Sequence, residues 1–361
     1  MHLYWRRLAA LCLPLGVLAL LTDPAEAHVK WFCGAVDVTS PPLALALVLS
    51  PTLLMLGAAA IALVSAGGGL DTLALRRWPF LLRRGRTSPR LEEALIRLGV
   101  GSYMVLLWAR LGVAPWGTAG EEAVLTPELL AQAAWVGWLQ LATAALVVFR
   151  LTCPLAGLGM LALWGIGVAE YGLFHMMDYT IFVGLAGYLA LSHPFFDRRP
   201  AWQEWRVSLI AATLGFSLMW TGIEKFLYPE WAAVILIAHP MITLNFPASF
   251  VTVAAGFVEF SVAFYLLVGR SLLRVDAAIV ILVLLAAVPE FGALDTVGHI
   301  PFVAMLLVLV LHGPSRLQQL VYPRQAGPLF AAAWTAVLYI LCFATVMAMY
   351  YGLQKAGTWP A

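Results

Sequence analysis

Charged residues are scarce in this 361-residue chain: Lys, Arg, Asp and Glu make up 11% of it, whereas hydrophobic residues make up 62%. Soluble proteins carry about 25% charged residues, so this composition excludes a soluble globular protein. Ten helices of about 20 residues, the length that crosses a hydrocarbon core, would use roughly 200 residues. The remainder leaves no room for a large soluble domain. The sequence therefore predicts an all-α, polytopic membrane protein.

Cysteine motifs and a continuous basic surface are also missing. The four cysteines show no CxxC or CxxCH spacing, which argues against a thioredoxin-like, zinc-ribbon or c-type haem site. The net charge is only +2, and the basic residues are scattered over short connections. A nucleic-acid partner needs a clustered basic face, so none is expected. The expected partner is the lipid bilayer.

The N-terminus has the features of an export signal. Two arginines precede an apolar run from Leu8 to Leu21, and the small residues Ala25 and Ala27 stand where a signal peptidase would need them. The apolar run is too short to span comfortably. We therefore expect cleavage before His28, and an uncleaved anchor helix is the alternative.

Apolar runs predict about ten spans in the mature chain, at 43–66, 94–113, 130–150, 154–172, 178–192, 207–227, 248–268, 275–292, 297–312 and 329–352. The connection at 67–93 carries six arginines, which the positive-inside rule places in the cytoplasm. Arginines of later connections fall on the same side of the alternation. This topology predicts a bacterial inner-membrane protein with both mature ends in the periplasm.

An internal repeat divides the predicted spans. Residues 169–194 align without a gap on 289–314, so that Glu170 pairs with Glu290 at an offset of 120. Each copy has four helices, and because this number is even, both copies enter the membrane from the same side. The copies should therefore be parallel and share a groove. The predicted organisation is a signal peptide (1–27), a first span with the basic connection (28–90), a degenerate first repeat (91–205), a second repeat (206–314) and a C-terminal helix with a short periplasmic tail (315–361).

One carboxylate is predicted near the middle of the bilayer. Glu259 lies about halfway along its span, where a charge costs several kcal/mol unless it is paired, protonated or wetted. Lys225, near the outer end of the preceding span, can reach it by extending its stem, so we expect an ion pair. A purely structural pair is the alternative. The counterpart in the first copy is the neutral Gln140, which makes the second copy the better site candidate.

Each predicted copy carries two carboxylates and one imidazole at its outer end: Glu170, His175 and Asp178 in the first, and Glu290, Asp295 and His299 in the second. Equivalent loops of parallel repeats lie on opposite sides of one axis, so these groups are expected to line a common cleft. For the two aspartates, helix N-capping is the alternative.

Two further histidines are predicted on the same outer face. An N-terminal His28 can chelate Cu(II) through its amine and Nδ1, and together with His175, His239 and His299 it forms a candidate metal set. His193 and His312 lie at predicted cytoplasmic helix ends, where a favourable dipole interaction is sufficient to explain them.

Several motifs resemble the DoxX/DoxD family of four-helix membrane proteins. The motifs are Gly222-Ile223-Glu224-Lys225-Phe226, Gly256-Phe257-Val258-Glu259, Gly269-Arg270 and the apolar helix leading to Glu290 and His299. The resemblance covers about 206–314 well and 91–194 weakly. It implies a compact bundle, and some relatives work as quinone-linked subunits of redox systems.

The leading functional prediction is a quinone-linked redox or accessory subunit. Its candidate catalytic residues are Lys225, Glu259, Glu290 and His299, with Glu170, His175, Asp178 and Asp295 completing a cofactor site. A periplasmic redox or metal-delivery protein is the expected partner, because nothing in the sequence supplies electrons. The alternatives are a periplasm-facing copper-binding or transport protein, a subunit with a b-type haem held between His175 and His299 or between His193 and His312, and a non-catalytic scaffold.

Overall fold

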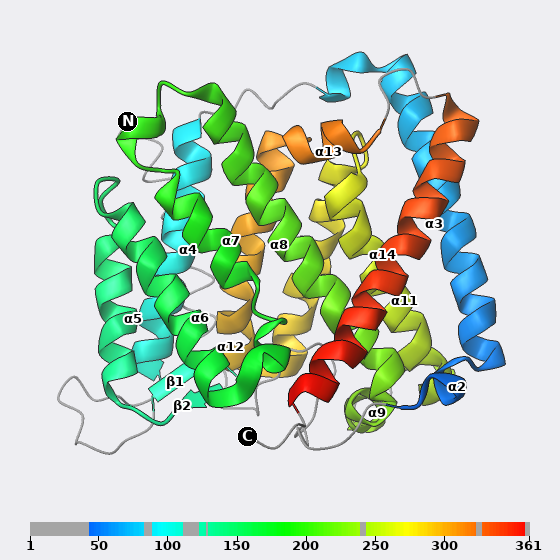
Figure 1. The fold of residues 1–361 in the computed structure, drawn as a ribbon, viewed down its shortest axis with the longest axis horizontal. Coiled ribbons are helices and arrows are strands. Elements are labelled where there is room, and N and C mark those ends of the chain that lie inside the picture. Colours follow the sequence, from blue (N-terminus) through cyan, green and yellow to red (C-terminus); the bar gives the residue numbers. More distant parts are fainter. Residues whose placement is uncertain are drawn as a thin grey trace.

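The computed structural model describes residues 43–82, 89–110, 123–127, 129–238, 243–322 and 327–357. These residues form a helical bundle (Figure 1) with the elements α2 (Leu45–Val48), α3 (Pro51–Arg77), η1 (Pro79–Leu82), α4 (Pro89–Arg110), β1 (Ala123–Thr126), β2 (Leu129–Ala131), α5 (Trp135–Leu146), α6 (Cys153–Met176), α7 (Ile181–Ala190), η2 (Pro194–Phe196), α8 (Pro200–Leu227), α9 (Pro229–Ala238), α11 (Ala248–Val268), α12 (Leu273–His312), α13 (Arg316–Val321) and α14 (Pro328–Gly357). The predicted all-α class is confirmed. The antiparallel β1–β2 hairpin is its only departure within these ranges. The predicted signal peptide lies outside them.

Five of the described helices are long and apolar enough to cross a membrane: α3, α6, α8, α11 and α14. Shorter apolar stretches occur at Trp135–Leu146, Ile181–Ala190 and Thr296–His312. Large apolar side chains are exposed on the outside of the bundle, among them Leu63, Leu282 and Leu329. Soluble monomers rarely expose so much apolar surface, and lipid accommodates it. These features identify a helical membrane protein.

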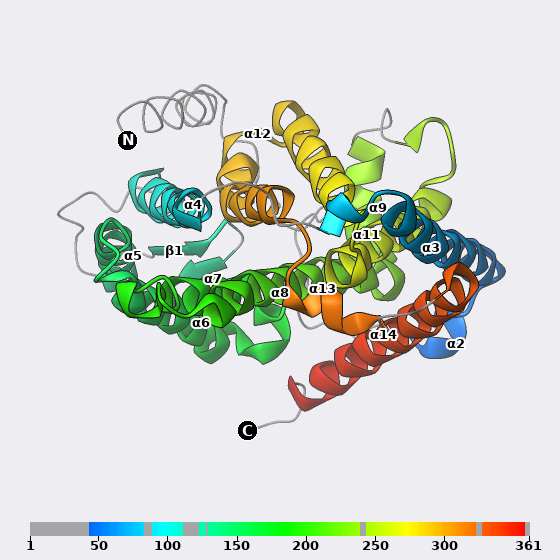
Figure 2. The same cartoon turned by 90° about the horizontal axis from the view of Figure 1, so that it is seen from above.

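Helix α12 folds back on itself. Arg274, near its beginning, donates hydrogen bonds to the main-chain oxygens of Val310 at 3.1 Å and His312 at 3.3 Å, near its end. A straight helix would separate these positions by about 50 Å. The helix therefore has two antiparallel legs, which Figures 1 and 2 show in yellow and orange. The legs correspond to the segments 275–292 and 297–312 that the sequence predicts as separate spans.

Helices α3 and α14, which flank the predicted repeats in the sequence, pack against each other at one edge of the bundle (Figure 2). Ser65 of α3 donates a hydrogen bond to the main-chain oxygen of Ala332 at 3.0 Å. A side chain at Gly68 would collide with Thr335. Small residues let these two backbones approach closely, as is common between membrane helices.

Connections that carry arginine meet at one end of the bundle, the upper end in Figure 1. Arg150 donates to Glu93 at 2.6 Å and to the two carboxylate oxygens of Asp197 at 2.9 and 2.5 Å. Arg206 Nη1 lies 3.6 Å from Glu93. We call this end, which holds Glu93, Arg150, Asp197 and Arg206, the arginine-rich end. It is the end that the positive-inside rule predicts to be cytoplasmic.

The Arg150–Asp197 pair predicts a dependence of stability on acid. The hydrogen bond from Arg150 lowers the pKa of Asp197. A lowered pKa in the folded state stabilises the fold above the ordinary carboxyl pKa, and this contribution is lost as the pH falls through the lowered value. Asp197 is 44% exposed, so we expect about 1 kcal/mol or less. Asp197→Asn should remove this part of the acid dependence, measured by thermal unfolding in detergent.

Glu170→Gln, at the opposite end of the bundle, is the control for this measurement. Its carboxylate is exposed and accepts a long 3.4 Å hydrogen bond from the main chain of Gln132. We expect its acid profile to follow that of the unmodified protein. If Asp197→Asn and the unmodified protein lost stability identically on acidification, the Arg150–Asp197 pair would contribute nothing.

Candidate functional site

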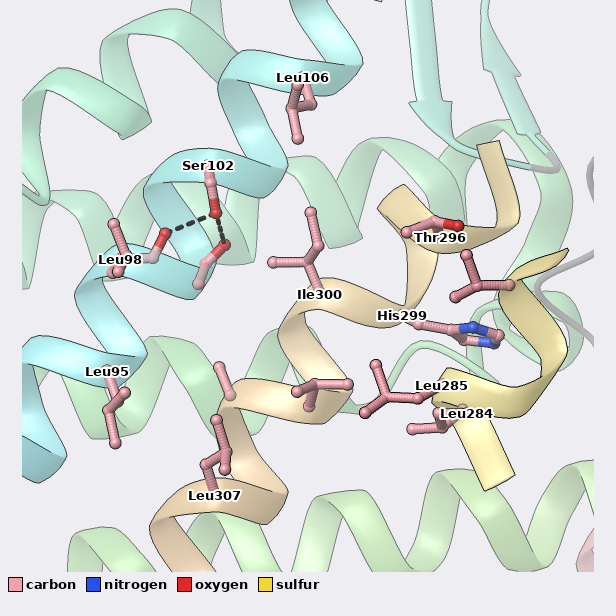
Figure 3. Close-up of a pocket in the computed structure, with 14 residues that line it drawn as sticks. Leu95, Leu98, Ser102, Leu106, Leu284, Leu285, Thr296, His299, Ile300 and Leu307 are labelled. Carbon is pink, nitrogen blue, oxygen red and sulfur yellow. Dashed lines mark hydrogen bonds between the residues drawn. The ribbon is translucent and has the colours of Figure 1, made fainter. Parts of the chain in front are cut away.

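An apolar pocket lies between α4 and the two legs of α12 (Figure 3). It encloses about 780 Å³ of free space, counted to include its open mouth. Its walls are mainly aliphatic, with Leu95, Leu98 and Leu106 on α4 and Leu284, Leu285, Ile300 and Leu307 on α12. Three polar side chains, those of Ser102, Thr296 and His299, reach the lining. An apolar cavity with a few polar groups is typical of small-molecule sites.

His299 is the most informative residue of this pocket. Its side chain is 5% exposed and extends from the second leg of α12 toward Leu284 and Leu285 on the first (Figure 3). The ring meets Phe302 edge-on, with 6.5 Å between centroids. A neutral imidazole offers one N–H donor and one acceptor. An ionisable group buried in a membrane bundle is by default a candidate functional residue.

The other polar groups differ in what they can offer a ligand. The Ser102 hydroxyl lies 2.7 Å from the main-chain oxygen of Leu98 and 3.2 Å from that of Gly99, so its proton is used within α4. Thr296 is buried one turn before His299. The polar side of the pocket is therefore made by the second leg of α12.

The mouth of the pocket is framed by side chains that face outward. Leu98 is 36% exposed and Leu285 is 39% exposed, and both line the pocket. They belong to the apolar outer surface that suits lipid. The pocket therefore opens on this apolar surface.

The predicted ion pair between Lys225 and Glu259 is confirmed. Nζ of Lys225 donates to Oε2 of Glu259 at 2.7 Å, and the side chains are 4% and 13% exposed. Close contact of α8 and α11 makes the pair possible: a Cβ at Gly222 would lie 3.1 Å from the main-chain oxygen of Gly256. Lys225 stands three residues after Gly222, and Glu259 stands three residues after Gly256. Both side chains therefore extend from the place where the two backbones meet.

Aromatic side chains pack around Glu224, the neighbour of Lys225 in the sequence. The buried Glu224 accepts a hydrogen bond from the Tyr350 hydroxyl at 3.1 Å, which connects α8 to α14. Tyr350 packs on Trp220 and Phe174, with centroids 4.6 and 4.8 Å apart. Neither Glu224 nor Tyr350 is among the site residues predicted from the sequence. The position of Glu224 directly before Lys225 is the one sequence feature that could have indicated its role.

The predicted catalytic residues do not form one group. Lys225 and Glu259 do not line the pocket that contains His299. The side chain of Glu290, like that of Asp295, lies outside the described residues. The ion pair and the pocket are therefore two separate features of the bundle.

The outer residues of the first predicted copy have local roles. Glu170 is exposed. His175 meets Phe174 edge-on, with centroids 5.1 Å apart. Asp178 is buried, and its main-chain oxygen accepts a hydrogen bond from Ser217. The alternative role of Asp178 as an N-cap does not hold, because α7 has Thr180 at its N-cap and no side-chain cap bond.

Gln140, the predicted counterpart of Glu259, is a structural anchor. Its Nε2 donates to the main-chain oxygen of Val124 at 2.5 Å. Both residues are buried. This contact fastens the β1–β2 hairpin to α5. The neutral amide supplies the N–H donor for this hydrogen bond, which an ionised carboxylate lacks.

A metal centre finds no support in the described part of the chain, where no three His, Cys, Asp or Glu side chains are placed to hold an ion. His28 and His239 of the predicted metal set lie outside it. A haem between His193 and His312 also fails. Nδ1 of His193 accepts from the main-chain nitrogen of Phe195, and both ring nitrogens of His312 lie against carboxylates.

The Lys225–Glu259 pair can be tested by a double-mutant cycle. Lys225→Met or Glu259→Gln alone leaves one buried charge without its partner, which costs about 3–5 kcal/mol. The double variant should cost less than the sum of the two, because no charge is then left, with a coupling energy of about 1–3 kcal/mol. Unfolding in detergent measures all four proteins. Lys225→Met combined with the distant Asp197→Asn should be additive, and additivity at Lys225 and Glu259 would show that the pair is not formed.

No protein-family model, curated protein or solved structure matches the chain. The resemblance to the DoxX/DoxD family therefore stays a prediction from sequence motifs. What this protein binds must be inferred from its own pocket, ion pair and buried charges.

Proposed function

We propose that this protein is a quinone-linked redox or accessory subunit of a bacterial inner membrane, and that the pocket between α4 and α12 holds the quinone head group. The observation that carries the proposal is the buried imidazole of His299 in an aliphatic pocket framed by outward-facing leucines. In this position the imidazole can donate a hydrogen bond to an apolar ligand that enters from the lipid.

The chemistry of the pocket fits a quinone. The head group is a flat ring with carbonyl oxygens, and the imidazole N–H of His299 can donate to such an oxygen. The aliphatic walls suit the ring faces and the isoprenoid tail. A bound quinone supplies two-electron, two-proton chemistry. A periplasmic redox partner would bring the electrons.

We place the protein across the membrane ten times, through α3, α4, α5, α6, α7, α8, α11, the two legs of α12 and α14. The arginine-rich end then faces the cytoplasm by the positive-inside rule, and both mature ends face the periplasm. The shorter helices α5 and α7 have only 12 and 10 residues. A membrane can accommodate such segments by local thinning, or by partner helices that shield them from lipid.

The packing of the helices supports two parallel repeats, α4 to α7 and α8 to the second leg of α12. Helix α4 packs against α12, and helix α8 packs against α7. The first helix of each copy therefore contacts the last element of the other. Two copies related by an axis along the membrane normal produce this reciprocal contact.

The two reciprocal contacts differ in their side chains at equivalent positions. Between α7 and α8, a Cβ at Gly184 would collide with Thr213, and one at Gly187 would collide with Leu209. At the offset of 120, the corresponding positions on α12 are Ala304 and Leu307, and both line the pocket. The proposed site thus lies at the α4–α12 contact.

Two measurements test this function. Lipid extracts of the protein purified from its native membrane should contain quinone. A short-chain quinone analogue should also bind the purified protein, and His299→Phe should weaken binding about fivefold, since a lost hydrogen bond is worth roughly 1 kcal/mol. Ser102→Phe, which fills the pocket, should abolish binding.

His193→Phe is the matched control, because His193 lies outside the pocket and its ring nitrogen caps a short turn. It should bind the analogue like the unmodified protein. Equal affinity in His299→Phe, or a purified protein without any quinone affinity, would refute the proposal.

A further inference from the structure

A buried histidine connects two carboxylates at the arginine-rich end. Nδ1 of His312 lies 3.2 Å from Oε2 of Glu92, and Nε2 lies 3.2 Å from Oε2 of Glu204. The three residues come from α12, α4 and α8. The two carboxylates flank the ring on opposite sides, so they cannot share one metal ion with it. They form a row of two hydrogen bonds.

The row holds two protons in each of its well-bonded states. A ring nitrogen and a carboxylate oxygen at 3.2 Å need a proton between them, because two lone pairs would otherwise face each other. Either His312 carries both protons, or it carries one and a carboxyl carries the other. All these states have the same net charge. A proton can therefore change place along the row without changing the net charge of the three groups.

The row also runs from the surface to the interior. Glu204 is 29% exposed, whereas His312 and Glu92 are fully buried. Glu92 lies one helical turn before Leu95, which lines the pocket. The inner end of the row therefore points to the same α4–α12 contact that contains the pocket.

We propose that Glu204, His312 and Glu92 form a proton relay from the arginine-rich end to the buried α4–α12 contact. A protonated Glu204 gives its proton to Nε2 of His312, and the ring gives its Nδ1 proton to Glu92. One O–H bond breaks at Glu204 and one forms at Glu92, and the net charge is unchanged. Once Glu92 has passed its proton on and Glu204 has been reprotonated, a half turn of the ring about Cβ–Cγ carries the remaining N–H from the Glu204 side to the Glu92 side. The relay does not depend on which ligand the pocket binds.

The charged groups beside the row are paired with other residues. On α4, the adjacent Glu93 is engaged by Arg97, Arg150 and Arg206. Arg206 on α8 also donates to the main-chain oxygen of Pro89 at 3.2 Å.

The second leg of α12 meets a further arginine. Arg274, from the first leg, donates to the main-chain oxygen of His312 at 3.3 Å. These guanidinium groups hold the ends of α4, α8 and α12 around the row.

The other reciprocal contact lacks the relay. The residue that aligns with His312 at the offset of 120 is Ser192. Its hydroxyl accepts a 3.5 Å hydrogen bond from Arg206. A permanently charged guanidinium does not release protons. The relay is therefore confined to the side of the bundle that has the pocket.

Infrared spectroscopy of the full chain in lipid nanodiscs tests the relay. The unmodified protein should show a carboxylic-acid band that Glu92→Gln removes, and its exchange on transfer to D₂O reports proton access to Glu92. His312→Gln keeps a hydrogen-bonding side chain but cannot pass a proton. It should slow this exchange on the order of 10²-fold, the low end for a positioned proton-transfer group.

Two further variants make the result decisive. Glu204→Asp keeps every charge but shortens the reach to His312, and it should slow the same exchange even if His312→Gln does not fold. Glu93→Gln, beside Glu92 but engaged by arginines, should leave the band and its exchange rate unchanged.

A purely structural tie would give a different pattern, since loosening the helix ends would make exchange faster. Unchanged or faster exchange in both His312→Gln and Glu204→Asp would overturn the relay, and so would the lack of any acid band that depends on Glu92. Loss of quinone binding would not alter these rates.

Discussion

The cost of removing charge from water governs the contacts of this bundle, because each buried charge must find a partner on another helix. Lys225 and Glu259 join α8 to α11. Asp71 of α3 receives hydrogen bonds from Arg270 and from the main chain at Ser271. Apolar packing alone provides little driving force between helices in lipid. The buried polar contacts therefore select which helices lie side by side.

The α4–α12 contact concentrates the features that suggest function. It contains the pocket with His299 and, at the arginine-rich end, the row formed by Glu204, His312 and Glu92. In the reciprocal α7–α8 contact, Gly184 packs against Thr213, and Ser192 stands at the position that aligns with His312. Under the proposed repeat, one of two equivalent interfaces serves as a scaffold and the other is adapted to chemistry.

The sequence alone predicted the membrane class, the all-helical fold and the Lys225–Glu259 pair. These follow from local quantities: the share of apolar residues, the length of apolar runs and the cost of a carboxylate far from water. The pair was accessible because a mid-span charge requires a partner, and Lys225 is the one cation in the preceding span. The sequence did not predict that this pair and His299 would occupy separate places.

Only the tertiary structure decided where His299 and His312 lie and what surrounds them. His312 appeared to need no more than a helix dipole, yet its partners Glu92 and Glu204 stand 220 and 108 residues earlier in the chain. Likewise, the pocket exists because α12 folds back and presents both legs to α4. Hydropathy reports how each segment meets lipid, but which segments meet each other depends on side-chain shape and charge across the whole bundle.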